Sequence, residues 1–220
     1  MYLNSTVPTS SRWPMAARQT VRTRVTITID HMKYQHQNLY HVYNRTINQE
    51  LLFRKHDNYQ FFIGKIRKHI LPRADLIAYC LMPTHFHLLL RPKALEIFPD
   101  QAGASRGLSR GIQDLLSTYA RAYNRVYQRT GNLFQQKTRA KITGALHHSG
   151  ADDKGHFTGL KQSCRCFHYI HNNPERAGLV DDILAWEYSS ALDYAGLRDD
   201  GLCNYHLTST LLKINRRAGR

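Results

Sequence analysis

The chain has 220 residues and a formal net charge of +15, with 31 Lys and Arg against 16 Asp and Glu. This length allows one domain with a proper core plus tails, and a field of this sign attracts polyanions, with nucleic acid as the default partner. An anionic membrane surface or an acidic protein would also satisfy the charge. No apolar run reaches transmembrane length, and the four cysteines show no regular pairing pattern, which excludes a membrane-spanning or disulfide-rich class and favours a cytoplasmic protein with reduced thiols.

Residues 1–31 differ in composition from the rest of the chain, because Ser, Thr and Arg dominate and the first acidic residue is Asp30. Transit peptides and basic DNA-grasping arms share this composition. A third interpretation is an upstream start codon chosen in error, with Met32 opening the protein. We favour this interpretation or a disordered tail, although the alternation that ends at Ile29 allows a short added strand. The expected organisation is a basic extension over 1–31, one domain over 32–196 and a basic tail over 197–220.

The first regular elements follow residue 38. Residues 39–45 have strand composition, and alternation places His41 and Tyr43 on one face. A helix is predicted over 56–70, where apolar residues recur at helical spacing. A second strand is predicted over 75–81.

Two histidines stand one residue apart in the stretch Cys80–Pro92. A turn around Pro83 leads into a strand that pairs with the preceding one as a hairpin. Alternation projects His85 and His87 from one face and Phe86 from the other, toward the core. Two imidazoles on one face of a rigid strand form a two-ligand platform for a divalent metal. Taken alone, a polar face with two solvated histidines is the commoner outcome.

A long helix is predicted over 105–128, followed by a basic strand over 133–142. The helix has an apolar stripe and a separate arc of arginines. The resulting order β-α-β-β-α-β predicts a ferredoxin-like α+β fold, an antiparallel sheet with both helices on one face. This topology leaves the other face for a later segment to cover.

The covering segment is predicted to be an added C-terminal helix over 157–173, stopped by Pro174 and reached through a flexible connection over 143–155. Tyr169 and Asn173 lie four residues apart on this helix and therefore point the same way. Taken singly, Tyr169 is more often a packing aromatic, and Asn173 is more often part of a helix stop.

Two separated stretches, Met82–Leu90 and Tyr169–Val180, resemble the motifs of single-tyrosine transposases that carry a His-hydrophobic-His motif. The closest branch is the REP-associated tyrosine transposases of bacteria. His41–Arg45 and Trp186–Ser190 are also similar, so the resemblance runs from about residue 34 to 196. Thr84 departs from the pattern, because Asn or Glu is more usual before the first histidine.

The resemblance implies that Tyr169 is the nucleophile and that His85, His87 and Asn173 are metal ligands. We expect the metal to be Mg²⁺ or Mn²⁺, because the ligand that the substrate supplies is a hard oxygen. The resemblance implies nicking and strand transfer on single-stranded, hairpin-associated DNA through a covalent 5′-phosphotyrosine with a free 3′ hydroxyl. It also implies a cytoplasmic, nucleoid-associated protein and allows a homodimer, in which the tyrosine acts within its own chain or in its partner. The side chains expected to contact DNA are Asn44, Arg45, Arg121, Arg125, Lys137, Arg139 and Arg176.

Several alternatives stay open. A metal-dependent phosphodiesterase would use water, with Tyr169 merely packing. A non-catalytic module would bind nucleic acid through exposed aromatics on a ferredoxin-like sheet, and an inactive or domesticated copy would do the same. Imidazoles also accept zinc, so the two histidines do not fix the identity of the metal.

Overall fold

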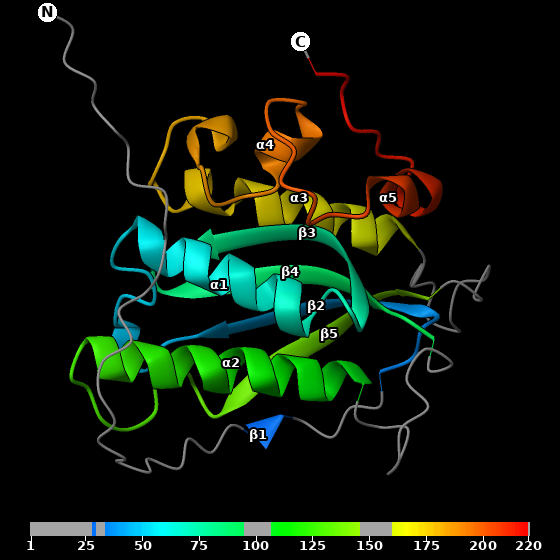
Figure 1. Ribbon diagram of the computed structural model, residues 1–220. Helices are drawn as coiled ribbons and strands as arrows, with labels where there is room; N and C mark the ends of the chain where they lie inside the picture. Colours follow the sequence, from blue (N-terminus) through cyan, green and yellow to red (C-terminus); the bar gives the residue numbers. More distant parts are fainter. Residues whose placement is uncertain (1–27, 30–33, 95–106, 146–159, 220) are drawn as a thin grey trace, which may run out of the picture.

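The computed structural model describes residues 28–29, 34–94, 107–145 and 160–219. Its centre is a four-stranded antiparallel sheet in the order β5-β2-β4-β3 (Figure 1). The strands are β2 (Asn38–Arg45), β3 (Ala74–Met82), β4 (His85–Pro92) and β5 (Lys137–Ala145). With α1 (His56–His69) after β2 and α2 (Gly107–Val126) after β4, the predicted ferredoxin-like α+β fold is confirmed.

A short strand, β1 (Thr28–Ile29), extends the sheet at its β5 edge. It pairs in parallel with the start of β5, where Thr28 lies opposite Lys137. The alternation that ends at Ile29 allowed such a strand. The remainder of the predicted 1–31 extension lies outside the described residues.

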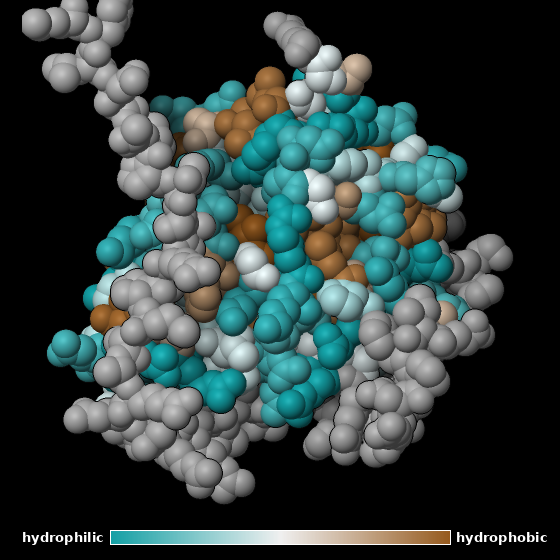
Figure 2. Space-filling view, viewed as in Figure 1, coloured by the Kyte–Doolittle hydropathy of each residue, from teal (hydrophilic) through white to brown (hydrophobic). Residues whose placement is uncertain are grey.

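The helices α1 and α2 cover one face of the sheet (Figure 1). Phe62 of α1 packs on Phe86 of β4 with ring centroids 5.2 Å apart, and Tyr119 of α2 packs on Phe62 at 5.0 Å. Burial of these large rings supplies much of the hydrophobic stabilisation of this layer. In Figure 2, hydrophilic residues cover most of the described surface on this side, with apolar residues showing between them.

The other face is covered by α3 (Leu160–Arg176), which packs across β3, β4 and β5. The helix stop predicted at Pro174 is wrong, since α3 continues for two more residues. A proline one turn from a helix end removes a single hydrogen bond, and Pro174 is buried. The helix ends instead at Arg176 and is followed by Gly178, which has φ 65°, and the amides of Gly178 and Leu179 donate to the carbonyls of Glu175 and Pro174.

The fourth antiparallel strand begins later than the sequence suggested. Residues 133–136 precede β5 as a bend, in which Phe134 forms an isolated bridge with Thr46, the residue after β2. Leu133 and Phe134 are buried, but they reach the core from this bend, where the amide of Ile47 donates to the Leu133 carbonyl at 3.0 Å. Apolar residues of a buried bend and of a strand look alike in sequence, which explains the error.

The segment 197–219 was predicted as a tail, but it belongs to the domain. It contains α5 (Tyr205–Leu212), which contacts α3 and β3, while the amide of Asn204 donates to the Leu76 carbonyl at 2.8 Å. Before it lies α4 (Ala191–Tyr194), and the 3-10 turns are η1 (Ile47–Gln49) and η3 (Ile183–Ala185). Within the described ranges, no helix is both long and apolar enough to span a membrane.

Candidate functional site

Both histidines of β4 face α3. His85 lies opposite Arg45 of β2 and His87 lies opposite Tyr43, two residues further along the ladder. The two-residue period of a strand therefore brings both imidazoles to one face, and their ring centroids are 5.1 Å apart with the planes at 90°. The tight connection from β3 to β4 fixes where this pair stands, because β4 begins with His85 itself.

Each imidazole is held through its Nδ1 atom. His87 Nδ1 lies 2.9 Å from His41 Nε2, and His85 Nδ1 lies 3.0 Å from the Thr84 hydroxyl. This leaves the Nε2 atom of each ring as the one that can bind a ligand, as in metal sites where a second hydrogen bond orients the imidazole. Sequence alternation placed His41 on this face, but it gave no sign of the contact with His87.

These rings are neutral at pH 7. Burial, and then the positive charge of Lys141, lowers the pKa of His41 to about 4. Burial lowers the pKa of His87 to about 2, with smaller contributions from His41 and His85, and the pKa of His85 is lowered by burial and then by Arg45. A neutral imidazole is the form that binds a metal ion.

Tyr169 lies over the imidazoles of His85 and His87, which we call the histidine platform. Its ring is edge-on to His87 and His41, with centroids 5.7 and 5.9 Å away, and the residue is 41% exposed. The guanidinium of Arg176, two turns further along α3, lies 5.8 Å from the ring centroid. An exposed phenol, neutral imidazoles and a cation thus meet within a single chain.

Asn173 follows Tyr169 by one helical turn. Its Nδ2 atom donates to the Tyr169 carbonyl at 2.8 Å, so Oδ1 is the atom that could bind a metal. Across the described segments, no hydrogen bond joins Asn173 to either histidine of β4. The structure therefore brings Tyr169 to His87, and it places Asn173 beside Tyr169 on the same helix.

The residues present fit a divalent ion that completes its coordination with substrate. Among the described residues, no group of three or more His, Cys, Asp or Glu could hold a metal. The two imidazole nitrogens of His85 and His87, with the amide oxygen that Asn173 was predicted to add, would form a neutral, partial donor set. Such a set leaves positions for phosphate oxygens and water.

A cleft of about 400 Å³ opens beside Tyr169 between α3 and the strands β2 and β5. Two cations line it, Lys141 from β5 and Arg165 from α3, together with Tyr43 and Gln162. None of these four residues was assigned to the site from the sequence. The sequence could have indicated two of them. Arg165 precedes Tyr169 by one helical turn, and Lys141 alternates with the other basic residues of its strand.

The basic residues predicted to contact DNA divide between the two faces of the sheet. Arg139 lies opposite Tyr43 in the ladder and is exposed on the α3 side. Arg176 lies on α3 beside Tyr169. Lys137 shares the face of Arg139 by alternation, and Arg45 stands beside His85. Arg121 and Arg125 are exposed on α2, which covers the opposite face.

Asn44 has a different place from that expected. It is 3% exposed, and its Nδ2 atom donates to the Thr138 hydroxyl at 3.0 Å and to the Gln135 carbonyl at 3.2 Å. Its Oδ1 atom accepts from the amide of Arg45 at 2.7 Å. Asn44 therefore ties β2 to the start of β5 and presents almost no surface to DNA.

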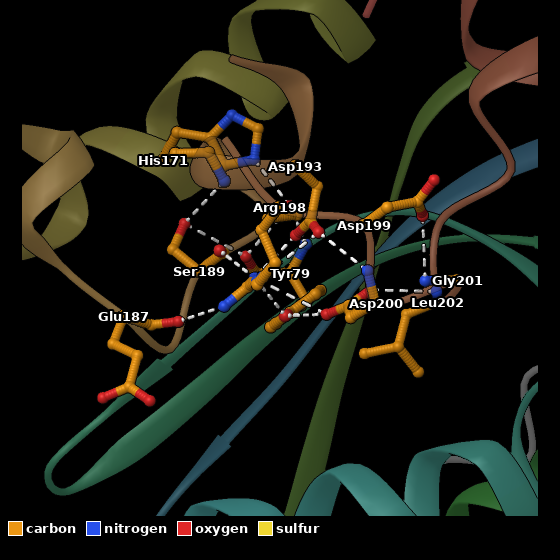
Figure 3. A network of polar contacts seen from close by, with 12 residues as sticks. Tyr79, His171, Glu187, Ser189, Asp193, Arg198, Asp199, Asp200, Gly201 and Leu202 are labelled. Carbon is orange, nitrogen blue, oxygen red and sulfur yellow. Dashed lines mark hydrogen bonds and ion pairs between the residues drawn. The ribbon is translucent and has the colours of Figure 1, made fainter. Parts of the chain in front are cut away.

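A buried histidine fixes the helix that carries Tyr169. His171 points away from the cleft, and its Nε2 atom lies 2.7 Å from the Ser190 hydroxyl, which also accepts from the Tyr79 amide of β3 at 2.9 Å. Figure 3 shows His171 above the polar network that joins β3 to the segment after α3. This contact sets the rotation of α3, and hence the side on which Tyr169 projects.

Comparison with known proteins finds similarity of fold. The chain resembles a solved structure of a REP-associated tyrosine transposase bound to a REP hairpin, with a TM-score of 0.53 and 17% sequence identity. The match covers 77% of this chain and 84% of that one. No protein-family model and no curated protein matches the chain.

Proposed function

We propose that this protein nicks and rejoins single-stranded DNA near hairpins, in a metal-dependent transposase reaction that passes through a covalent bond between Tyr169 and a 5′ phosphate. One observation carries the proposal: the exposed Tyr169 phenol on α3 lies edge-on to His87, which shares one face of β4 with His85. The net charge of +15 suits a polyanion. The solved transposase of similar fold is bound to a hairpin, which supports a hairpin-associated substrate here.

His85 and His87 would hold a Mg²⁺ or Mn²⁺ ion through their Nε2 atoms, with Asn173 supplying its Oδ1 atom. When bound, such an ion polarises the scissile phosphate and balances the charge of its transition state. His41 and Thr84 keep the two imidazoles oriented through Nδ1. The Arg176 guanidinium adds positive charge beside the phosphate that Tyr169 attacks.

The phenol oxygen of Tyr169 forms a bond to phosphorus as the bond from phosphorus to the departing 3′ oxygen breaks. The phenol gives up its proton and the departing oxygen gains one, so the products are a 5′-phosphotyrosine and a free 3′ hydroxyl. A phosphodiester is exchanged and none is hydrolysed. Rejoining therefore follows the same steps in reverse and needs no nucleotide cofactor.

The test is covalent capture of a labelled strand. The full-length protein with Mn²⁺ and a single-stranded oligonucleotide that contains a hairpin should give a protein–DNA adduct on a denaturing gel. Tyr169→Phe should abolish this adduct, because phenylalanine has no nucleophilic oxygen. Tyr205→Phe is the matched control, because it removes a phenol hydroxyl from α5, outside the site.

Either of two results would contradict the proposal and support an alternative function. Full cleavage by Tyr169→Phe, with no adduct in the unaltered protein, would identify a phosphodiesterase that uses water. Unchanged DNA affinity in His85→Ala and His87→Ala, with no metal-dependent product, would identify a binding module.

A further inference from the structure

The cleft beside Tyr169 has one wall from α3 and one from the sheet. Gln162, Arg165, Cys166 and Tyr169 follow the helical spacing of three, four and seven residues, so one stripe of α3 forms the first wall. Residues of β2 and β5, with Tyr43 among them, form the second wall. The nucleophile proposed above therefore stands at the edge of a formed cavity.

Two positive charges face each other across this cleft. Lys141 is exposed on β5, opposite His41 in the ladder, and its charge contributes to lowering the pKa of His41. Arg165 is exposed on α3. Neither cation forms an ion pair with another residue of the described part of the chain. Two uncompensated cations on opposite walls are suited to a phosphate group.

An aromatic ring is fixed on the sheet side of the same cleft. Tyr43 is half-buried, and its ring packs on His41 and His87 with centroids 4.8 and 5.6 Å away. A ring held in this way offers a ready stacking surface for a nucleobase, since stacking needs little ordering of the protein. Ile142, which is 56% exposed, adds apolar surface at the cleft.

Gln162 supplies a polar group that can distinguish one base from another. Its side-chain amide both donates and accepts hydrogen bonds, and it is exposed on the first wall. Glutamine amides read base edges in this way. The cleft volume of about 400 Å³ falls in the range of sites for small ligands, about 300–1,000 Å³, and is far too small for a duplex.

We propose that this cleft binds one unpaired nucleotide adjacent to the scissile phosphate, with the base stacked on Tyr43, its edge read by Gln162 and its phosphate held by Lys141 and Arg165. This inference deepens the proposed function and rests on it. It assigns a position in the single strand at which base identity matters, and the residues that read it.

The experiment measures binding without chemistry. Fluorescent single-stranded hexanucleotides without a hairpin are titrated with the full chain in EDTA, and anisotropy gives the affinity. Lys141→Ala and Arg165→Ala should each weaken binding about tenfold or more. Lys68→Ala on α1 and Arg217→Ala near the C-terminus remove the same charges from exposed positions outside the cleft and should weaken binding about twofold at most.

A second series locates the base. A single abasic site is moved along the hexanucleotide, and one position should cost the unaltered protein most of its affinity. In Tyr43→Leu an abasic site at that position should lower the affinity no more than one elsewhere, because the stacking surface is lost. Gln162→Ala should keep the abasic profile but bind all four bases at that position with equal affinity. Melting temperatures confirm that each variant is folded.

The inference is overturned if the two cleft variants weaken binding no more than their controls, or if Tyr43→Leu keeps the abasic profile of the unaltered protein. Adduct formation by the unaltered protein is scored separately. If the cleft variants weaken binding but no adduct forms, the proposed reaction is wrong and the nucleotide-binding cleft stands. If an adduct forms but the cleft variants bind as their controls do, only this inference is wrong.

Discussion

The two imidazoles of the histidine platform, His85 and His87, are both oriented by a neighbour and both neutral. Each ring is held by a hydrogen bond at Nδ1, shared with His41 in one case and with Thr84 in the other, and both remain neutral at pH 7. Neutral donors bind a hard cation weakly, because they bring no charge to offset its lost hydration. In the proposed reaction, a phosphate oxygen from DNA would supply both the charge and the missing ligand.

Metal affinity should therefore depend on DNA. With Tyr169→Phe, which prevents reaction, we expect Mn²⁺ to bind at least about tenfold more tightly in the presence of a single-stranded oligonucleotide than in its absence. The electron paramagnetic resonance signal of free Mn²⁺ measures this directly. The control is His85→Ala combined with His87→Ala, which should remove the DNA-dependent binding. Equal affinity with and without DNA would show that the protein alone completes the site.

His171 should make the protein less stable in mild acid. Burial lowers the pKa of His171 to about 3, from an ordinary value of 6.5 in the unfolded chain, so folding favours the neutral ring. Its contribution is fully present above about pH 6.5 and is lost as the pH falls toward 3, at up to about 1.4 kcal/mol per pH unit. His171→Gln removes this titration.

Urea unfolding of both proteins at pH 7 and pH 5 measures the effect. Between these two pH values, the free energy of unfolding should fall by about 2 kcal/mol more in the unaltered protein than in His171→Gln. The comparison cancels the contributions of the other histidines. Parallel losses in the two proteins would show that His171 is protonated in the folded state.

At the scale of elements, periodicity in the sequence predicted most of what the structure contains. The four strands, the helices on one face and the helix that covers the other follow from spacings of two and 3.6 residues. Element ends were less predictable, because Pro174 and Leu133 carry local signals that tertiary packing overrides. Site contacts between distant segments, such as His41 with His87, depend on strand register, which alternation alone does not supply.

The packing of α1 on α2 depends on one glycine. A β-carbon at Gly111 would lie 2.9 Å from the Arg73 side chain and closer still to the carbonyl oxygen of His69. Backbone cannot yield as a flexible side chain does, so Gly111→Ala should destabilise the protein by about 1–3 kcal/mol. Gly64→Ala in α1 is the matched control, since nothing lies within 4 Å of its added methyl group, and it should stabilise the helix by about 0.5–1 kcal/mol. Urea unfolding measures both, and a neutral Gly111→Ala would mean that the helices can separate at little cost.

At the scale of the whole molecule, the segment after α3 wraps the outer edge of the sheet. The Leu81 amide of β3 donates to the Tyr188 carbonyl at 2.9 Å, and the Ser190 amide donates to the Tyr79 carbonyl at 3.0 Å. Further along, the Tyr79 hydroxyl donates to Asp200 at 2.6 Å (Figure 3). These contacts occupy backbone groups that the edge strand β3 would otherwise expose. They also join the C-terminal segment to β3, the neighbour of the strand that carries the two histidines.

One arginine holds this segment in place. Arg198 donates to both carboxylate oxygens of Asp193, at 3.1 and 2.6 Å, and to the Tyr79 hydroxyl at 2.8 Å. The Asp193 side chain is fully buried, so Arg198→Ala would leave an unpaired carboxylate inside the protein and should cost about 3–5 kcal/mol. Arg198→Ala combined with Asp193→Asn buries no charge and should recover part of that loss.

Urea unfolding gives both free energies, and limited proteolysis shows where each variant opens. Cleavage in Arg198→Ala should begin within residues 197–219, because that segment is held by this network, and it should slow again in the double variant. If Arg198→Ala were as stable as the unaltered chain, the segment would not need the network. If the double variant lost as much stability as the single one, the missing hydrogen bonds would be responsible and the buried charge would not.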